Sequence, residues 1–332
     1  MAHLPVLADA AVAALEPRDG GVYVDATFGG GGYTRLLLAT AGCRVVAFDR
    51  DPDAAARARV MAAGEAPGRL AVVEAPFGRM REGLAEHGLD KVDGIVFDLG
   101  VSSFQLDDPA RGFSFRAAGP LDMRMSREGP SAADLVNTLG EAELARLLRE
   151  LGDEPAAKRI AKAVAAERLK APIATTDALA ALVARVKGRR DGRDPATLTF
   201  QALRMAVNDE LGELARALDA AEDLLRPGGR LVVVAFHSGE DAIVKRFIDA
   251  RGGRPEPAAN RHLPVTSAAA PAAPRWRWLS RKVAVPGQVE RDRNPRARSA
   301  RLRAAERLAT ADGGEAGEPA AAGGGVTWRL AA

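Results

Sequence analysis

The stretch Gly21-Val-Tyr-Val-Asp-Ala-Thr-Phe-Gly-Gly-Gly-Gly32 decides the fold, because a short apolar run leads directly into a run of glycines. Three further runs rich in Val and Ile follow at Arg44–Asp49, Leu70–Val73 and Gly94–Asp98. Helical patterns separate these runs. Strands that alternate with helices in this way predict βαβ units and a parallel sheet.

The pattern changes in the middle of the chain, where no strand-like run appears between Phe104 and Asn208. The strand pattern returns at Arg230–Phe236. We therefore expect an α/β fold in which one mostly parallel sheet is interrupted by an inserted helical domain. A separate second domain would leave the last strand without a sheet. The expected parts are the first part of the core at 1–103, the insertion at 104–208, the second part of the core at 209–307, and a disordered tail at 308–332.

Three helix signals refine this prediction. Thr138-Leu-Gly-Glu141 fits a capping box, in which the Thr and Glu side chains bind free backbone N–H groups. A helix should start near Thr176. Apolar residues in steps of three and four from Phe200 to Leu225 predict one long amphipathic helix, which Pro227-Gly-Gly229 would end.

The net charge of +3 over 332 residues hides an uneven distribution. The segment 251–307 holds 14 Lys and Arg against four Asp and Glu, so it carries +10 and the rest carries −7. This favours a surface for an anionic partner such as nucleic acid, although a merely solvated basic surface fits the count equally well. A lone Cys43, no long apolar run and no secretory pattern predict a cytoplasmic protein with no membrane segment.

The glycines and three carboxylates predict a ligand site. Ligands of open parallel sheets bind at the carboxyl ends of the strands, where Gly29–Gly32 lies. The dinucleotide pattern G-x-G-x-x-G fails, because its third glycine would fall on Thr34. Asp25, Asp49 and Asp98 would repel a pyrophosphate but attract the sulfonium and ammonium groups of S-adenosylmethionine. Asp49 could also accept hydrogen bonds from a ribose diol.

Ten short motifs occur in order along the chain: His3-Leu-Pro-Val-Leu7, Asp25-Ala-Thr-Phe-Gly-Gly-Gly-Gly32, Phe48-Asp-Arg-Asp-Pro52, Asp98-Leu-Gly-Val-Ser-Ser103, Arg111-Gly-Phe-Ser-Phe115, Gly119-Pro-Leu-Asp-Met-Arg-Met125, Phe200-Gln-Ala-Leu-Arg204, Asn208-Asp-Glu-Leu211, Phe236-His-Ser-Gly-Glu-Asp241 and Asn294-Pro-Arg-Ala-Arg-Ser-Ala300. This set closely resembles the bacterial ribosomal RNA small-subunit methyltransferase H family of the MraW type. The resemblance implies a Rossmann-like, class I methyltransferase fold with an inserted helical domain. It also implies transfer of a methyl group from S-adenosylmethionine to the exocyclic N4 of one cytidine in 16S rRNA, in the decoding region of the small ribosomal subunit.

The resemblance also implies a set of cofactor contacts: Gly31, Gly32, Tyr33, Asp49, Phe77, Asp98 and Gln105. Phe77 could stack on adenine or be an ordinary core aromatic. The chain departs from the family at three places, because Tyr33 replaces a His, Asp194 replaces a His, and Gly239 and Ala242 replace a Leu and an Arg. Tyrosine keeps a hydrogen-bonding group, so we expect cofactor binding to survive.

Three residues are candidates for catalysis. Asp98 stands where many methyltransferases of exocyclic amines carry an Asp/Asn-Pro-Pro-aromatic motif, although Leu-Gly-Val follows it here. It is either an acceptor beside the reacting amine or, as the resemblance implies, a cofactor contact. Asp122 and His237 are the further candidates, and a purely structural histidine is an equal alternative for His237. We expect no metal.

The basic segment should contact the phosphate backbone of RNA. The candidate contacts are Arg275, Arg277, Arg296, Arg298, Arg301 and Arg303. Trp276 and Trp278 could stack on unpaired bases or could pack this segment onto the sheet. A methyltransferase for another RNA and a non-catalytic RNA-binding assembly factor remain the alternative functions.

Overall fold

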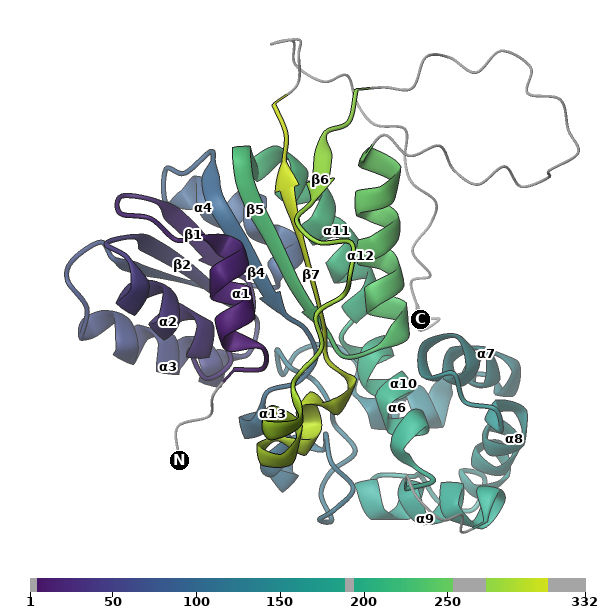
Figure 1. Cartoon of the computed structure of the whole chain (residues 1–332). Helices are drawn as coiled ribbons and strands as arrows, with labels where there is room; N and C mark the ends of the chain where they lie inside the picture. The colour runs from purple at the N-terminus through teal and green to yellow at the C-terminus, as the bar shows by residue number, and fades with distance from the viewer. Residues whose placement is uncertain (1–4, 189–193, 253–272, 310–332) are drawn as a thin grey trace, which may run out of the picture. The chain divides into compact units, whose positions relative to one another are not determined.

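The computed structural model describes residues 5–188, 194–252 and 273–309 and divides them into two compact units. The described parts of Met1–Gly100 and Glu213–Gly324 form the first unit, and Val101–Gly212 forms the second. The colours of Figure 1 show that the chain leaves the first unit once and later returns to it. The predicted disordered tail lies outside the described residues except for positions 308 and 309.

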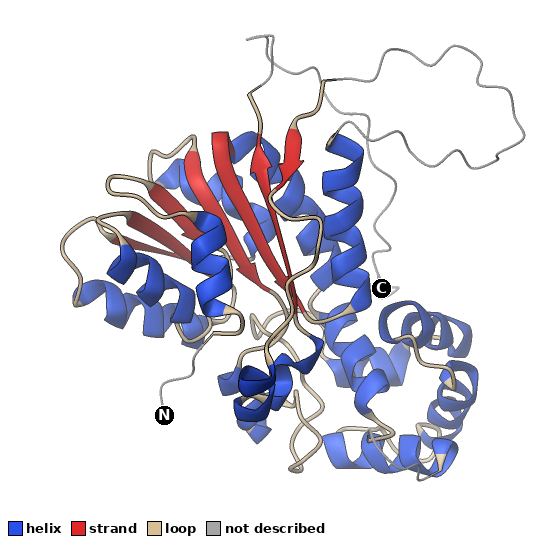
Figure 2. Cartoon of the chain, viewed as in Figure 1, coloured by secondary structure: helices blue, strands red, loops and turns tan. Residues whose placement is uncertain are grey.

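The first unit contains a seven-stranded sheet in the order β3-β2-β1-β4-β5-β7-β6, drawn in red in Figure 2. The strands are β1 (Val22–Asp25), β2 (Arg44–Asp49), β3 (Leu70–Glu74), β4 (Val92–Asp98), β5 (Leu225–Ala235), β6 (Trp276–Trp278) and β7 (Arg301–Arg307). The first five are parallel to one another, whereas β7 is antiparallel to both of its neighbours, β5 and β6. The predicted mostly parallel sheet and its five strand runs are confirmed.

Helices cover both faces of this sheet. The helices of this unit are α1 (Ala8–Leu15), α2 (Gly32–Thr40), α3 (Pro52–Ala63), α4 (Met80–Glu86), α11 (Glu210–Leu224), α12 (Ser238–Arg251) and α13 (Gln288–Arg293), with short 3-10 turns η1 (Phe77–Arg79) and η3 (Pro295–Ser299). Successive strand residues point to opposite faces. Along β4, Ile95 and Phe97 therefore join the core under α4, α11 and α12, while Val96 joins the core under α1, α2 and α3.

The second unit is helical and has a core of its own. Its helices are α5 (Ser103–Asp107), α6 (Ala132–Thr138), α7 (Glu141–Gly152), α8 (Ala157–Glu167), α9 (Thr176–Lys187) and α10 (Thr197–Val207), with the 3-10 turn η2 (Pro109–Arg111). Leu147 and Leu148 of α7, Ile160 of α8 and Leu203 of α10 are among its buried residues. The described part of this unit contains no strand, as the sequence predicted, and α9 begins at Thr176.

Two helix predictions were wrong. The predicted capping box at Thr138–Glu141 does not form, because Thr138 ends α6 and its hydroxyl donates to the Asp134 carbonyl. At the start of α7 the Gly140 N–H instead donates to the Glu143 carboxylate at 3.2 Å. The predicted long helix is broken into α10 and α11 at Asp209, whose φ is 47°. Apolar periodicity continues through that break, so the pattern could not show it. Asn and Asp enter the left-handed region more easily than most residues.

The same part of the chain shows no candidate for crossing a membrane. No helix among the described residues is both long enough and apolar enough to do so.

Candidate functional site

The glycine-rich loop after β1 is held in shape by Asp25. Its carboxylate accepts hydrogen bonds from the Thr34 N–H (3.1 Å), the Thr34 hydroxyl (2.7 Å) and the Thr27 N–H (3.2 Å). Asp25 is fully buried, and this burial raises the pKa of its carboxyl despite the three hydrogen bonds. Asp25 therefore organises the loop from inside, and its effect on a cationic ligand acts through its charge.

Two glycines of the loop leave no room for a side chain. At Gly31, where φ is +75°, an added Cβ would lie 2.5 Å from the Met61 Cε and 2.7 Å from the Phe28 Cζ. At Gly32 an added Cβ would lie 2.8 Å from the Pro5 Cδ. Both positions therefore require glycine, because the backbone of the loop packs closely against neighbouring side chains. Contact of Gly31 and Gly32 with the cofactor stays a prediction.

Asp49, at the end of β2, turns toward the same loop. Its carboxylate accepts from the Gly29 N–H at 2.8 Å and the Asp51 N–H at 2.9 Å. Burial raises its pKa to about 6, against the lowering effect of these bonds. Each carboxylate oxygen can accept a second hydrogen bond. Asp49 can therefore still bind a ligand hydroxyl.

Asp98, at the end of β4, has an unused acceptor. Its N–H donates to the Thr27 hydroxyl at 2.7 Å, but its buried Oδ1 has no hydrogen-bond partner among the described residues. Burial raises its pKa to about 8, and the charges of Asp25 and Glu240 add to this rise. A buried acceptor without a partner costs about 1–3 kcal/mol. A donor or cation supplied by a ligand would remove that cost.

The three carboxylates share one edge of the sheet. Strands β2, β1 and β4 are neighbours and parallel, and Asp49, Asp25 and Asp98 are their last residues. Their negative charge suits a cationic ligand that also carries hydroxyl groups. The described residues hold no group of three or more His, Cys, Asp or Glu that could bind a metal.

Phe77 follows β3 and is only partly buried. Its ring packs edge-on against Phe97, with the ring centres 5.6 Å apart and the planes at 88°. This contact fixes the ring to the core. Stacking of its remaining surface on adenine stays a prediction.

Tyr33 is buried, with 2% of its surface exposed. Its hydroxyl donates to the Val6 carbonyl, and burial raises its pKa well above the usual value. The hydroxyl thus joins the N-terminal segment to the start of α2. Tyr33 therefore shapes the loop with its hydroxyl, and a direct contact between its ring and the cofactor stays a prediction.

Replacing Tyr33 with Phe should weaken this connection. We expect a loss of stability of about 1 kcal/mol and an affinity for S-adenosylhomocysteine that is lower by about fivefold, because the loop loses its tie to Val6. Isothermal titration calorimetry and urea unfolding would measure the two effects. The matched control is Tyr23→Phe, since the Tyr23 hydroxyl binds Glu16 and Arg18 at the opposite end of β1. Equal affinity losses in both variants would contradict the role of Tyr33.

His237 caps the start of α12. Its Nδ1 accepts from the Gly239 N–H at 3.1 Å, and the Glu240 carboxylate accepts from the N–H groups of Phe236 and His237 at 2.9 and 3.0 Å. An Nδ1 that accepts a hydrogen bond carries no proton. The structure thus gives His237 the structural role that was the alternative in the sequence. A catalytic role for it stays a prediction.

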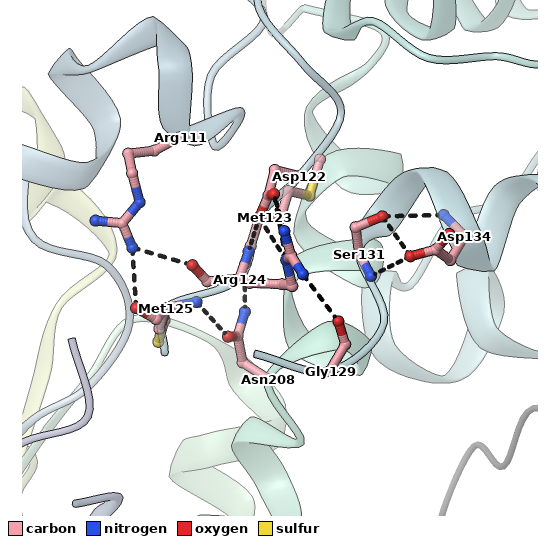
Figure 3. A network of polar contacts seen from close by, with 9 residues as sticks. All are labelled: Arg111, Asp122, Met123, Arg124, Met125, Gly129, Ser131, Asp134 and Asn208. Atoms are coloured by element: carbon pink, nitrogen blue, oxygen red, sulfur yellow. Dashed lines mark hydrogen bonds and ion pairs between the residues drawn. The ribbon is translucent and has the colours of Figure 1, made fainter. Parts of the chain in front are cut away.

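The remaining predicted cofactor contact, Gln105, and the remaining catalytic candidate, Asp122, lie in the second unit. Gln105 is buried, and its Oε1 accepts from the Ser102 N–H at 2.9 Å in the cap of α5. Asp122 binds the Arg124 side chain, with a shortest distance of 2.6 Å, and also accepts from the Arg124 N–H (Figure 3). Burial raises the pKa of Asp122, but the hydrogen bonds and charge of Arg124 outweigh it, and the net pKa is lowered. Asp122 is therefore an ionised acceptor and a weak base.

Arg111 and Asn208 support the loop that contains Asp122 (Figure 3). Both residues stand in motifs quoted above, where neither was given a role. Arg111 donates to the carbonyls of Arg124 and Met125 at 3.0 and 2.9 Å. Asn208 donates to the Met123 carbonyl at 2.8 Å and accepts from the Met125 N–H at 2.9 Å. The motifs contain both residues, and they also contain Thr27 and Glu240, but they gave none of the four a role. Thr34 lies outside the motifs and had no signal of its own.

Most of the predicted RNA-binding arginines form ion pairs. Two arginines of β7 bind the Asp241 carboxylate. Arg301 donates one hydrogen bond to it at 3.2 Å, and Arg303 donates two. Arg277 binds both oxygens of Glu306 at 3.0 Å, and Arg275 lies 3.2 Å from Glu222. The two other candidates, Arg296 and Arg298, are exposed.

The two tryptophans of β6 pack onto the first unit. Trp276 is 1% exposed, its Nε1 donates to Glu222 at 3.3 Å, and its ring lies 5.4 Å from that of Phe247. Trp278 donates to Asp249 at 2.9 Å. Stacking of Trp276 on an RNA base is therefore wrong, because the ring is enclosed in the core.

The strand order, the glycine loop after β1 and the acidic ends of β2 and β4 define a class I S-adenosylmethionine-dependent methyltransferase. The sequence pattern of the MraW methylase family matches residues 1–308. The chain therefore belongs to the MraW methylase family, and the predicted family, fold class and cofactor are confirmed.

Two relatives with similar sequences agree with this assignment. The chain is 55% identical over 310 residues to "Ribosomal RNA small subunit methyltransferase H" of Acidiphilium cryptum (strain JF-5), covering 93% of this chain and 98% of the relative. It is 56% identical over 306 residues to the protein of the same name from Rhodospirillum centenum (strain ATCC 51521 / SW), covering 92% of each. A solved rRNA methylase from Streptococcus thermophilus shows 12% identity, 93% and 99% coverage and a TM-score of 0.41.

Proposed function

We propose that this protein methylates the exocyclic N4 of one cytidine in the 16S rRNA of the small ribosomal subunit. Two relatives that are 55% and 56% identical carry the name of a small-subunit rRNA methyltransferase, and this supports the RNA substrate. The observation that carries the reaction is the buried Asp98 Oδ1, which has no partner among the described residues. A carboxylate in that state can accept a hydrogen bond from an amino group.

The residues of the first unit fit S-adenosylmethionine. Gly31 and Gly32 allow the close turn of the loop, Asp49 has acceptor capacity left for a ribose hydroxyl, and Asp98 has a buried oxygen without a hydrogen-bond partner among the described residues. When bound, the cofactor supplies an electrophilic methyl group on a sulfonium. Phe77, Tyr33 and Gln105 remain proposed contacts.

Asp98 has the task of preparing the amine. The nitrogen lone pair of cytosine N4 is delocalised into the ring and is a poor nucleophile. An ionised Asp98 that accepts one N–H draws the nitrogen toward a tetrahedral shape, so that the lone pair can face the methyl group. Holding the reactants in this orientation supplies much of the rate increase. Asp122 and His237 are weaker candidates, because Arg124 and the cap of α12 already engage them.

The inserted helical unit is the proposed site of substrate recognition. Cytosine in structured RNA must turn out of its stack to reach a buried carboxylate, and a separate unit can hold the displaced strand. The protein would act in the cytoplasm, where small subunits are found.

Incubation with labelled S-adenosylmethionine tests the proposed function. Small subunits that lack their native methylation are the substrate, and naked 16S rRNA is the comparison. We expect label on N4 of a single cytidine. Label that is absent from 16S rRNA contradicts the proposal, while label in a different RNA supports the alternative enzyme. A non-catalytic assembly factor would bind the subunits without transferring label.

A further inference from the structure

The segment between β6 and β7 lies at the cofactor end of the sheet. Arg301, the first residue of β7, pairs with Ala235, and Leu302 pairs with Val234. Val234 in turn pairs with Asp98 on β4. Strand β7 therefore starts at the edge where β4 and β5 end. The residues that lead into it, 280–299, must approach that same edge.

Direct contacts join this segment to the glycine loop. The Glu290 carboxylate on α13 accepts from the Leu7 N–H at 2.7 Å, and the neighbouring Val6 carbonyl accepts from Tyr33. Two consecutive residues of the N-terminal segment thus connect α13 with the start of α2. Ala297 is fully buried in the same apolar cluster as Tyr33. The segment is therefore packed in place beside the loop.

The segment 280–299 is basic, with six Lys and Arg against two acidic residues. Both acidic side chains are engaged, Glu290 by Leu7 and Asp292 by the Gln288 amide at 2.8 Å. Four cations are exposed and form no ion pair with any described residue, and we call them the cationic platform: Arg281, Lys282, Arg293 and Arg298.

The other arginines of the basic region differ in their partners. Arg277 is paired with Glu306, and Arg301 and Arg303 share Asp241. An arginine already bound to a carboxylate has its charge compensated and must give up that partner to bind a phosphate. These pairs also link β6 to β7 and β7 to α12. Their cations therefore stabilise the edge of the sheet.

We propose that the cationic platform binds the sugar-phosphate backbone of the rRNA substrate beside the reacting cytidine. The paired residues Arg275, Arg277, Arg301 and Arg303 do not form this surface. The inference rests on the proposed function for the identity of the RNA. Four unpaired cations at the cofactor end hold the substrate where methyl transfer occurs, and they account for part of the charge of +10 that the sequence revealed.

Salt-dependent binding tests the platform directly. The variant in which all four platform residues are replaced by Gln should bind naked 16S rRNA at least about tenfold more weakly at 0.1 M salt. The slope of log K against log salt should fall in magnitude by about 3, since each phosphate contact on a single strand contributes about 0.7 and on a duplex about 0.9. Fluorescence anisotropy at four salt concentrations measures both values.

Single substitutions distinguish the platform from general charge. Arg293→Gln should lower the slope by nearly one unit, whereas Arg277→Gln, with the same loss of charge, should lower it by less than half as much. Lys245→Gln, an exposed cation on α12, controls for net charge. Affinity for S-adenosylhomocysteine and the Tm should stay unchanged in the platform variants, which shows that they are folded.

The outcomes separate this inference from the proposed function. An unchanged slope in the fourfold variant, or equal effects of Arg293→Gln and Arg277→Gln, overturns the platform even where the wild-type protein methylates 16S rRNA. Wild-type protein that binds RNA through the platform but transfers no label contradicts only the proposed function. Failure of the wild-type protein to bind RNA also overturns the inference. So does binding to polyglutamate that is as tight as binding to RNA and that the fourfold variant weakens.

Discussion

Replacing Asp98 with Asn should lower kcat for methyl transfer by at least about a hundredfold, because an amide is a much weaker acceptor for the amine than a carboxylate. The side chain keeps its size, so the ends of β1 and β4 should not move. Affinity for S-adenosylhomocysteine should stay within about threefold of the wild type if Asp98 acts on the amine. Single-turnover transfer of label and calorimetric titration measure the two quantities.

The alternative role of Asp98 gives the opposite result. If Asp98 serves only as a cofactor contact, the Asn variant should bind S-adenosylmethionine more weakly and recover full turnover at saturating cofactor. That recovery would remove Asp98 from the catalytic residues. Asp49→Asn is the matched comparison, since Asp49 ends the neighbouring strand β2 and is expected to affect cofactor affinity alone.

The pKa of Asp98 adds a pH dependence to this prediction. Burial raises the pKa to about 8, so the carboxyl is largely protonated at pH 6 in the protein without ligand. The reaction needs the ionised form, and kcat/KM should therefore rise with pH and level off above about 8. The Asn variant should lose this rise. A wild-type profile that is flat from pH 6 to 9 would contradict the assignment.

The same shift affects stability in the opposite direction. A carboxyl whose pKa is higher in the folded than in the unfolded protein contributes stability at low pH, and this is lost as the pH rises through about 8. Above pH 8 the protein without ligand holds a buried, ionised and unpartnered oxygen. We expect Asp98→Asn to be more stable than the wild type there by about 1–3 kcal/mol, measured by urea unfolding.

The sequence predicted the features that follow from local patterns. Val- and Ile-rich runs located the five parallel strands, because a strand buried on both faces must be continuously apolar. The break at Asp209 was missed, since the apolar spacing from Phe200 to Leu225 is unaffected by one residue with positive φ. Local spacing carries no information about such a change of direction.

The candidate site shows the same limit at the level of contacts. Asp49 and Asp98 were predicted because strand ends meet at one edge. The sequence could not show that Asp25 is occupied by Thr34 or that Tyr33 binds Val6, because both contacts depend on how the loop folds back. A charge count likewise cannot distinguish Arg277, which Glu306 neutralises, from Arg293.

Asn208 offers the largest expected effect in the second unit. The side chain is 1% exposed and makes three hydrogen bonds, to the Met123 carbonyl, the Arg204 carbonyl and the Met125 N–H, two of which appear in Figure 3. Asn208→Ala removes the partners of the Met123 carbonyl and the Met125 N–H, whereas the Arg204 carbonyl still accepts from the Asn208 backbone N–H at 3.1 Å. Each buried group left without a partner costs about 1–3 kcal/mol. We expect the second unit to lose about 3 kcal/mol.

The loop beside Asn208 explains why activity should fall with stability. Met123 adopts a φ of 64°, an unfavourable conformation for its side chain, so the Asp122–Arg124 pair keeps its orientation only while Asn208 and Arg111 hold the adjacent backbone. Hydrogen exchange should show faster exchange at Met125 in Asn208→Ala. Glu128→Ala, an exposed change in the same loop, should alter neither exchange nor turnover. If Asn208→Ala loses stability but keeps full turnover at a temperature where it is folded, the orientation of Asp122 is not needed for the reaction, and Asp122 ceases to be a catalytic candidate.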